Sequence, residues 1–509
     1  MNKSYIVAVD IGSSEVVVAV GSLAEGGAVN VETIVTEHTE GMAAGLVDNS
    51  QLVTDALRRA LARAEEQAGI AITEAYVSIS GKFVRCARYT DYVFVKDAEN
   101  RISQLDLTAL HEERMSNVKA ADGETIMDFF PLCYKSDAGV EMKNPVGCYS
   151  KQLSSTYNFI LCENMAKDRL RRVFLDAHVK VRGLYAGAAV VADSVVNSEE
   201  KEEGVAIVDI GSGVTDVAIY YGGVLCYIAS IPMGGSALNT DIRIYDGHIP
   251  PRYIENLKRE LGSAVVSLTP DEVIQVRSRN RTIKSILRLN LASVIEARMT
   301  DIAEYVWNEI REAGFAKKLS AGIVLTGGVA DLKNVADLFN RVTGQETRVA
   351  CAEIGVSTES LEKVSSPNFT LAVSMLLRGA KVGACPVGVI HSSAQPVERT
   401  NISGGVAGLV VASVAGAGIG AAQAAPAQPT QPRTVNESFG APAAGETPAH
   451  STAQTLTTPN IATPEPNDYE DDDDFDDDVK RSGGLFGKIT NWFNDAFRNP
   501  DEGDDDDNY

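Results

Sequence analysis

The chain has 509 residues, of which 44% are hydrophobic and 23% charged, and its formal net charge is −23. This length is sufficient for two to four domains with a sizeable core. The charge is uneven, because residues 391–509 hold 20 acidic and only 6 basic residues. A balance this acidic argues against nucleic acid as a ligand.

The seven cysteines are irregularly spaced and contain no CxxC pair. Neither a disulfide framework nor a zinc site is indicated, so a reducing cytoplasm is the simplest compartment. The opening MNKSYIVAVD has too few consecutive apolar residues for the hydrophobic region of a signal peptide. It predicts a buried strand.

Two stretches repeat each other at an offset of 199 residues. Val9–Val20 is VDIGSSEVVVAV and Val208–Ile219 is VDIGSGVTDVAI, and the two align without a gap. Each pattern predicts a strand, a tight Asp-x-Gly-Ser turn and a second strand, which together make a β-hairpin. A hairpin that occurs twice, each time followed by mixed strand and helix patterns, predicts an α/β protein with two related lobes.

Between the hairpins, Gln51–Glu66 predicts an amphipathic helix with one apolar face: Leu52, Val53, Ala56, Leu57, Ala60, Leu61 and Ala64. Residues 75–170 predict strands, a helix over Asp106–Val118, further strands and a helix over Lys167–His178. This arrangement indicates a small α+β module inserted in the first lobe. Val181–Val196 predicts a strand that leads to a helix of small residues.

The hairpin turns have the composition of a phosphate site. Glycines at positions 12, 211 and 213 let the backbone approach a ligand, and successive N–H groups in such turns form a concavity for anions. A carboxylate heads each turn, at Asp10 and Asp209, which suits a magnesium ion held through its water shell. Further hydroxyl donors are Ser13, Ser14, Ser212 and Thr215. A structural turn is the simpler interpretation of one such hairpin, but two in register favour a polyphosphate ligand.

A third glycine turn follows an apolar strand at Ala321–Leu332, where Gly327 and Gly328 precede a predicted helix. A nucleotide could pack there against bare backbone. The sequence has no GxxxxGK[ST] motif and no GxGxxG after a strand, which disfavours the P-loop and Rossmann folds.

The last part of the chain differs in composition. Residues 391–467 are rich in Ala, Gly, Pro, Thr and Gln and predict a disordered linker. Within them, Ile402–Ala422 is uncharged over about the length of a membrane span, but its Gly and Ala content favours a flexible linker over a transmembrane helix.

Leu485–Arg498 predicts an amphipathic helix with one apolar face that would lie in a membrane interface or dock on a partner. Acidic runs flank it, at Glu470–Asp478 and Asp501–Asp507. These runs weaken or tune membrane attachment, attract a basic partner, or only keep the tail soluble. The residues expected to enter the membrane are Leu485, Phe486, Ile489, Trp492, Phe493 and Phe497.

The two hairpins, the small-residue helix before the second one and the later TGG turn resemble the phosphate 1, connect 1, phosphate 2 and adenosine motifs of the actin, Hsp70 and sugar-kinase superfamily. Within it, residues 4–385 resemble the FtsA family of bacterial cell-division proteins. Three stretches carry this resemblance: KNPVG (143–147), LASVIEAR (291–298) and AGIVLTGG (321–328).

The resemblance implies an actin-like (ribonuclease H-like) fold that binds ATP and Mg²⁺. It implies phosphate contacts from Asp10, Gly12, Ser13, Ser14, Gly211, Ser212, Gly213 and Thr215. It also implies that Asp209 and Asp10 hold magnesium through water and that Gly327 and Gly328 approach the adenosine. Glu255 and Lys258 match the family's E-x-x-K pattern and would contact ribose or base, although such pairs are also common on solvated helices.

The resemblance further implies the domain organisation. The first lobe is expected over 1–83 and 171–200, the inserted module over 84–170, the second lobe over 201–240 and 306–390, its smaller subdomain over 241–305, the linker with its acidic run over 391–482, the terminal helix over 483–499 and an acidic tail over 500–509.

One departure bears on turnover. Actin-like ATPases carry a Gln or Glu on the connecting segment to orient the attacking water, whereas here no suitable side chain follows until Asp193. No catalytic residue is therefore assigned, and we expect a slow ATPase at most, with ATP as a structural or polymerisation ligand.

The function that the resemblance implies is to anchor the FtsZ ring to the cytoplasmic face of the inner membrane at the septum and to help recruit later division proteins. The FtsZ C-terminal peptide would bind the smaller subdomain of the second lobe, and the chain would assemble with itself head to tail. The alternatives are a pilus-assembly ATPase of the same superfamily, or a sugar kinase or Hsp70-class ATPase.

Overall fold

The structure is a computed structural model of the full chain. It describes residues 4–24, 26–114, 118–246, 249–277, 283–383, 385, 387–389 and 455–456. The predicted linker, acidic runs and terminal helix lie outside these residues, as does Ile402–Ala422.

Two five-stranded sheets share one topology. The first sheet has the order β13-β7-β1-β2-β3, and the second, read from its other edge, has the order β20-β19-β14-β15-β16. In both, the first three strands run parallel and the last two complete antiparallel hairpins. The strands of the first sheet are β1 (Tyr5–Ile11), β2 (Glu15–Leu23), β3 (Val29–His38), β7 (Glu74–Ile79) and β13 (Lys180–Ala186). Those of the second are β14 (Val205–Ile210), β15 (Thr215–Tyr221), β16 (Val224–Ile231), β19 (Ile323–Thr326) and β20 (Thr347–Val349).

This shared order confirms the two related lobes that the repeated hairpin predicts. The strands β1 and β14 are buried along almost their whole length, because each lies between a parallel and an antiparallel neighbour at the centre of its sheet. The predicted N-terminal strand is therefore also confirmed.

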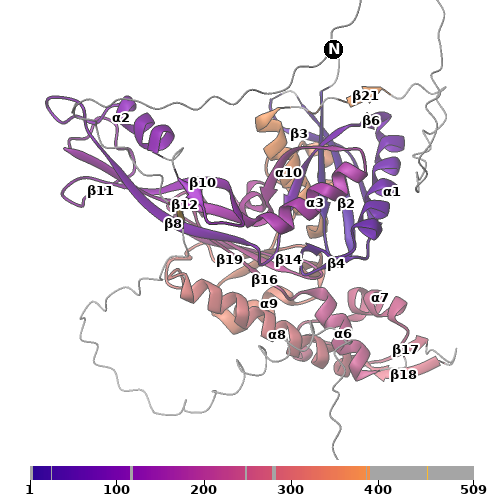
Figure 1. Cartoon of the computed structure of the whole chain (residues 1–509). Coiled ribbons are helices and arrows are strands. Elements are labelled where there is room, and N and C mark those ends of the chain that lie inside the picture. The colour runs from indigo at the N-terminus through magenta and orange to yellow at the C-terminus, as the bar shows by residue number, and fades with distance from the viewer. Residues whose placement is uncertain are drawn as a thin grey trace, which may run out of the picture. The chain divides into compact units, whose positions relative to one another are not determined.

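The helix α1 (Ser50–Ala68) shows how local chemistry sets an element's ends. The Asn49 side chain accepts a hydrogen bond from the Leu52 N–H, and Gly69 closes the helix at φ 66°. Its apolar face packs on β2 and β3, while α10 (Thr370–Val382) packs on β1, β2 and β7 (Figure 1). Every residue of the predicted apolar face is buried except Leu52, which is 43% exposed.

A four-stranded sheet lies in the predicted inserted module, in the order β11-β10-β12-β8. These strands are β8 (Val84–Phe94), β10 (Glu124–Lys135), β11 (Glu141–Met142) and β12 (Gln152–Glu163). Its own apolar core includes Tyr157 and Phe159. The long strand β10 also contacts the two larger apolar clusters of the molecule, one through Met127 and Phe130 and the other through Leu132.

The helix predicted over Asp106–Val118 is partly wrong. The structure has a short helix, α2 (Gln104–Thr108), continued by a π-turn over Ala109–Arg114. A reciprocal pair of hydrogen bonds between Ser103 and Asp106 fixes the start two residues earlier than predicted. The second predicted helix of this region is α3 (Asn164–Asp176).

The remaining elements complete the two lobes. Helices α6, α7 and α8 lie together with the hairpin β17–β18 (Figure 1). The helices are α4 (Gly187–Val190), α5 (Ser198–Glu203), α6 (Gly235–Tyr245), α7 (Pro251–Leu261), α8 (Arg288–Glu312) and α9 (Val335–Thr343). The short strands are β4 (Met42–Ala43), β5 (Leu46–Val47), β6 (Ile70–Ile72), β9 (Lys119–Ala120), β17 (Val273–Arg277), β18 (Ile283–Leu287), β21 (Val387–Val389) and β22 (Thr455–Leu456).

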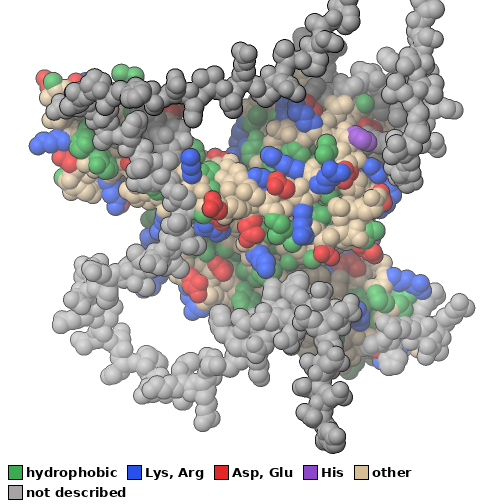
Figure 2. All heavy atoms as spheres, viewed as in Figure 1, with side chains coloured by type: hydrophobic (Ala, Val, Ile, Leu, Met, Phe, Trp, Pro, Cys, Tyr) green, Lys and Arg blue, Asp and Glu red, His purple; other side chains and the backbone are tan. Residues whose placement is uncertain are grey.

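Acidic and basic side chains alternate over the face shown in Figure 2 and do not gather into one patch. Among the described helices, none has both the length and the apolar composition needed to cross a bilayer.

Candidate functional site

The turns of the two hairpins border one cavity. In each turn the N–H of the motif's glycine donates to a carbonyl three residues on, Gly12 to Glu15 and Gly211 to Val214, both at 2.9 Å. The cavity contains about 760 Å³ of space not filled by protein atoms, part of it open to solvent. The repeated sequence therefore brings two equivalent turns to one site, although they are almost 200 residues apart.

Several glycines of this cavity leave no room for a side chain. A Cβ atom at Gly213 would overlap the Ser13 hydroxyl of the opposite turn. Gly327 has φ +88°, and a Cβ there would overlap the Asp209 carboxylate and approach the Ile210 carbonyl oxygen to 2.7 Å. A Cβ at Gly328 would lie 2.9 Å from Asn368 Oδ1. Glycine is therefore required at these positions because protein atoms around the cavity pack directly against the backbone.

Four carboxylates line the cavity, those of Asp10, Glu15, Asp209 and Asp216, whereas none of the described residues that line it is Lys or Arg. The Ser78 hydroxyl donates to Asp10 at 2.6 Å, and Ser230 donates to Asp216. A ligand that carries negative charge therefore needs a cation here.

The pKa values of the three aspartates show that their negative charges are unfavourable in this cavity. Burial raises the pKa of Asp209 to about 8, with the charges of Asp216 and Asp10 adding to the effect. Burial likewise raises the pKa of Asp216 to about 6, against the hydrogen bond from Ser230. The pKa of Asp10 is also raised by burial, while its bond from Ser78 lowers it. A cation between these groups would favour their charged forms.

A second cavity of about 500 Å³ adjoins the first. The two cavities share five lining residues: Ser14, Glu15, Ser212, Gly328 and Asn368. Glu255 and Lys258, on α7, line only the second cavity, and their ion pair is 2.8 Å long. Burial lowers the pKa of the Lys258 ammonium, and Glu255 opposes that shift.

The structure thus brings together all but one of the predicted ligand residues of the described region. Those that line one or both cavities are Asp10, Gly12, Ser13, Ser14, Asp209, Gly211, Ser212, Gly213, Glu255, Lys258, Gly327 and Gly328. Thr215 lies elsewhere: it is fully buried in β15, and its hydroxyl donates to the Met233 carbonyl at 2.8 Å. The predicted membrane residues Leu485, Phe486, Ile489, Trp492, Phe493 and Phe497 lie outside the described residues.

Sequence reasoning missed five polar residues of the first cavity: Glu15, Ser78, Ser80, Asp216 and Asn368. Asp216 left a signal, because an acidic residue inside a strand that is otherwise apolar is unusual. Ser78 and Asn368 left none, since they reach the site from β7 and from the short 3₁₀ helix before α10.

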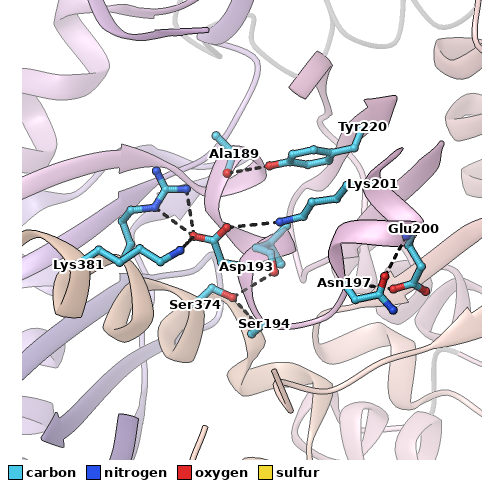
Figure 3. Close-up of polar contacts among 11 residues, drawn as sticks. Ala189, Asp193, Ser194, Asn197, Glu200, Lys201, Tyr220, Ser374 and Lys381 are labelled. Carbon is cyan, nitrogen blue, oxygen red and sulfur yellow. Dashed lines mark hydrogen bonds and ion pairs between the residues drawn. The ribbon is translucent and has the colours of Figure 1, made fainter. Parts of the chain in front are cut away.

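Asp193, the first acidic residue after the connecting segment, is not in either cavity. Its carboxylate pairs with Arg378 at 3.1 Å, Lys381 at 3.5 Å and Lys201 at 3.7 Å (Figure 3). The neighbouring Ser194 hydroxyl lies 2.7 Å from that of Ser374. These contacts hold the connection between the lobes against α10, and the Asp193 carboxylate is paired with three cationic side chains.

The residues present fit a magnesium-bound polyphosphate. Glycines of both turns line the cavity, and no Lys or Arg among its described lining residues offsets the carboxylates. Over the part of the chain that the structure describes, no group of three or more His, Cys, Asp and Glu side chains could hold a metal by itself. A magnesium ion here would therefore take its ligands from water and phosphate, and Asp10 and Asp209 would accept hydrogen bonds from its water shell.

Comparison with known proteins places the chain in a family. The family model "Cell division protein FtsA" matches residues 206–374. The FtsA protein of Escherichia coli K12 is 31% identical over 389 residues, which is 74% of this chain and 91% of that protein. The FtsA protein of Pseudomonas aeruginosa PAO1 is 28% identical over 377 residues, 74% of this chain and 89% of that protein.

The fold also has a counterpart among solved structures. A chain of the PilM–PilN type IV pilus biogenesis complex superposes with a TM-score of 0.50 at 14% identity, covering 74% of this chain and 98% of that one. At this identity the likeness shows the actin-like fold and nothing about pili. This likeness and the duplicated sheets show that the chain has the actin-like fold. Its relatives show that the chain belongs to the FtsA family of cell-division proteins.

Proposed function

We propose that the two hairpins hold the phosphates of ATP with Mg²⁺, and that this nucleotide organises a division protein that links FtsZ to the membrane. The observation that supports nucleotide binding best is the single cavity between the two glycine turns, with carboxylates and bare backbone on its walls. The second cavity, which adjoins it, would take the nucleoside.

Each lining residue has a role in this proposal. The N–H groups of Gly12 and Gly211 close their own turns. The backbone N–H groups that follow them, at Ser13–Ser14 and Ser212–Gly213, would donate to phosphate oxygens. Asp209 and Asp10 would hold the water shell of the magnesium ion, which supplies the positive charge that the cavity lacks. The bare backbone of Gly327 and Gly328 would face the adenosine, and the Glu255–Lys258 pair would border its ribose or base.

We propose that ATP is turned over slowly if at all. Phosphoryl transfer to water needs a group that orients the nucleophile. The first acidic side chain after the connecting segment, Asp193, is paired with Arg378, Lys381 and Lys201 away from both cavities. A steady-state turnover on the scale of kinases, about 1–100 s⁻¹, that is lost in an Asp209→Ala variant would contradict this proposal.

The membrane and partner roles rest on the family and on the sequence of the tail. The chain would attach to the inner membrane through Leu485–Arg498 and bind the C-terminal peptide of FtsZ with its second lobe. It would also recruit later division proteins and assemble with itself.

Nucleotide binding is tested by calorimetric titration of the full chain with ATP and Mg²⁺. We expect the wild type to bind one ATP, and a Gly213→Leu variant to lose at least about 100-fold in affinity, because the new side chain would push against Ser13. A normal thermal transition in the variant would show that it folds. Absence of ATP binding by the wild type would refute the nucleotide site.

Membrane attachment is tested by flotation of the full chain with liposomes of anionic lipid. A Trp492→Glu change places a charge on the predicted apolar face and should abolish flotation. Asn491→Glu adds the same charge on the predicted polar face and should leave flotation largely intact. Equal flotation of the wild type and Trp492→Glu would contradict the anchor, and titration with an FtsZ C-terminal peptide tests the partner separately.

A further inference from the structure

The junction of the two cavities holds a polar pair that no part of the proposed phosphate chemistry uses. Glu15 follows the first glycine turn, and Asn368 belongs to the short 3₁₀ helix Pro367–Phe369 that directly precedes α10. Asn368 Nδ2 donates to Glu15 Oε2 at 3.0 Å. Both residues line both cavities, so the pair lies where a ligand would pass from one to the other.

The orientation of Asn368 is fixed by the second sheet. Its side-chain oxygen lies over Gly328, as the 2.9 Å approach of a Cβ there shows. The preceding Pro367 carbonyl accepts from the Gly327 N–H at 3.2 Å and from the Thr326 hydroxyl at 3.3 Å. These contacts hold the backbone next to Asn368 in place, and the Asn368 amide orients the Glu15 carboxylate through the 3.0 Å hydrogen bond between them.

Charge makes phosphate a poor partner for Glu15 on the side of the first cavity. A carboxylate repels phosphate oxygens, and no Lys or Arg among the described lining residues of that cavity offsets the repulsion, whereas Lys258 and Arg259 line the second cavity. Glu15 Oε2 already accepts from Asn368, while Oε1 makes no hydrogen bond within the described part of the chain. An ionised carboxylate oxygen only accepts hydrogen bonds, so a ligand group that binds it must carry an O–H or N–H donor.

We propose that Glu15, positioned by Asn368, accepts a hydrogen bond from the ribose hydroxyls and so selects ribonucleotides over deoxyribonucleotides. This inference rests on the proposed nucleotide site. The ribose is the uncharged, hydroxyl-bearing part of a nucleotide, and it connects the phosphates to the base as the junction connects the two cavities.

The test compares ATP, 2′-deoxyATP and 3′-deoxyATP, each with Mg²⁺, in titrations of the full chain. A hydrogen bond to a charged group corresponds to about tenfold or more in affinity. The wild type should therefore bind ATP at least about tenfold more tightly than one of the two deoxynucleotides. In Glu15→Ala the affinity for ATP should fall to that of this deoxynucleotide, whose own affinity should not decrease.

Two further variants sharpen the result. Glu66→Ala removes the same charge from the exposed face of α1 and should keep the full preference for ATP. Asn368→Ala leaves Glu15 in place but unoriented and should reduce the preference without abolishing it.

The outcomes separate the two proposals. Equal binding of all three nucleotides by the wild type, or an equal loss for all three in Glu15→Ala, would overturn the role of Glu15 while leaving the nucleotide site intact. A wild type that binds none of them would overturn the nucleotide site itself.

Discussion

The two hairpin turns have the same backbone but different surroundings. In the first sheet, the residue beside Asp10 on the parallel neighbour is Ser78, and its hydroxyl donates to the Asp10 carboxylate. In the second sheet, the residue beside Asp209 is Thr326. Its hydroxyl bonds instead to Thr370 Oγ1 at 2.8 Å and to the Pro367 carbonyl.

This difference accounts for the contrast between the two aspartates. Asp10 has a donor that partly offsets its burial, whereas the donor at the equivalent position of the second lobe holds the segment that carries Asn368. Asp209 is therefore left with burial and two neighbouring carboxylates, which raise its pKa to about 8. The two turns are therefore equivalent in their backbone. In the second lobe, however, the Thr326 hydroxyl beside the aspartate holds the segment that carries Asn368 and does not bond to Asp209.

The largest effect is expected from Gly327→Val. The position has φ +88° and its Cβ would overlap the Asp209 carboxylate. We expect the free energy of unfolding to fall by about 2–4 kcal/mol and ATP binding to be lost altogether. Denaturant unfolding and ATP titration measure the two losses.

Gly344→Val is the matched control, because Gly344 has φ +68° but no atom within 4 Å of its Cβ position. It should lose only about 1–2 kcal/mol of stability, from backbone strain, and bind ATP normally. If both variants lost ATP binding, strain alone would explain the result and the overlap with Asp209 would not matter.

A smaller effect is expected from pH. Because the folded-state pKa of Asp209 is raised above the unfolded value, the folded chain binds the extra proton between these two pKa values. The protein without ligand should therefore lose stability as pH rises from about 5 to about 9.

Asp209→Asn should flatten this dependence and melt at a higher temperature than the wild type at the alkaline end. Asp10→Asn should flatten it less, because Ser78 already stabilises the charged Asp10. Thermal unfolding at several pH values, without Mg²⁺ or nucleotide, measures both slopes. Equal slopes for the two variants would mean that the hydroxyl donor does not distinguish the turns.

The smallest effect tests what the turns have in common. A Cβ at Gly12 would lie 3.1 Å from the Glu15 carbonyl oxygen, and one at Gly211 would lie 3.1 Å from that of Val214. Gly12→Ala and Gly211→Ala should each cost about 1 kcal/mol in stability, and the two costs should agree within about 0.5 kcal/mol. A clear inequality in denaturant unfolding would show that the turns are not equivalent even in their backbone.

Sequence patterns predicted the elements that are determined by interactions between residues close together in the chain. The Asp-x-Gly-Ser turns, the apolar face of α1 and the TGG turn were all predictable, because turn chemistry and helical periodicity act within a few residues. The helix over Asp106–Val118 was misplaced, since the Ser103–Asp106 capping bonds outweigh the apolar pattern that follows them. Thr215 is expected at the ligand as a hydroxyl donor near the second turn, but in the structure its hydroxyl donates to the Met233 carbonyl.

The sequence by itself determined that the chain has two related lobes and that each lobe has a glycine turn headed by an aspartate. Only the tertiary structure decided which side chains surround these turns. Asn368 reaches Glu15 across 353 positions of sequence, and Asp193 reaches Lys381 across 188. Contacts at such separations depend on how whole elements pack, which no pattern of neighbouring residues records.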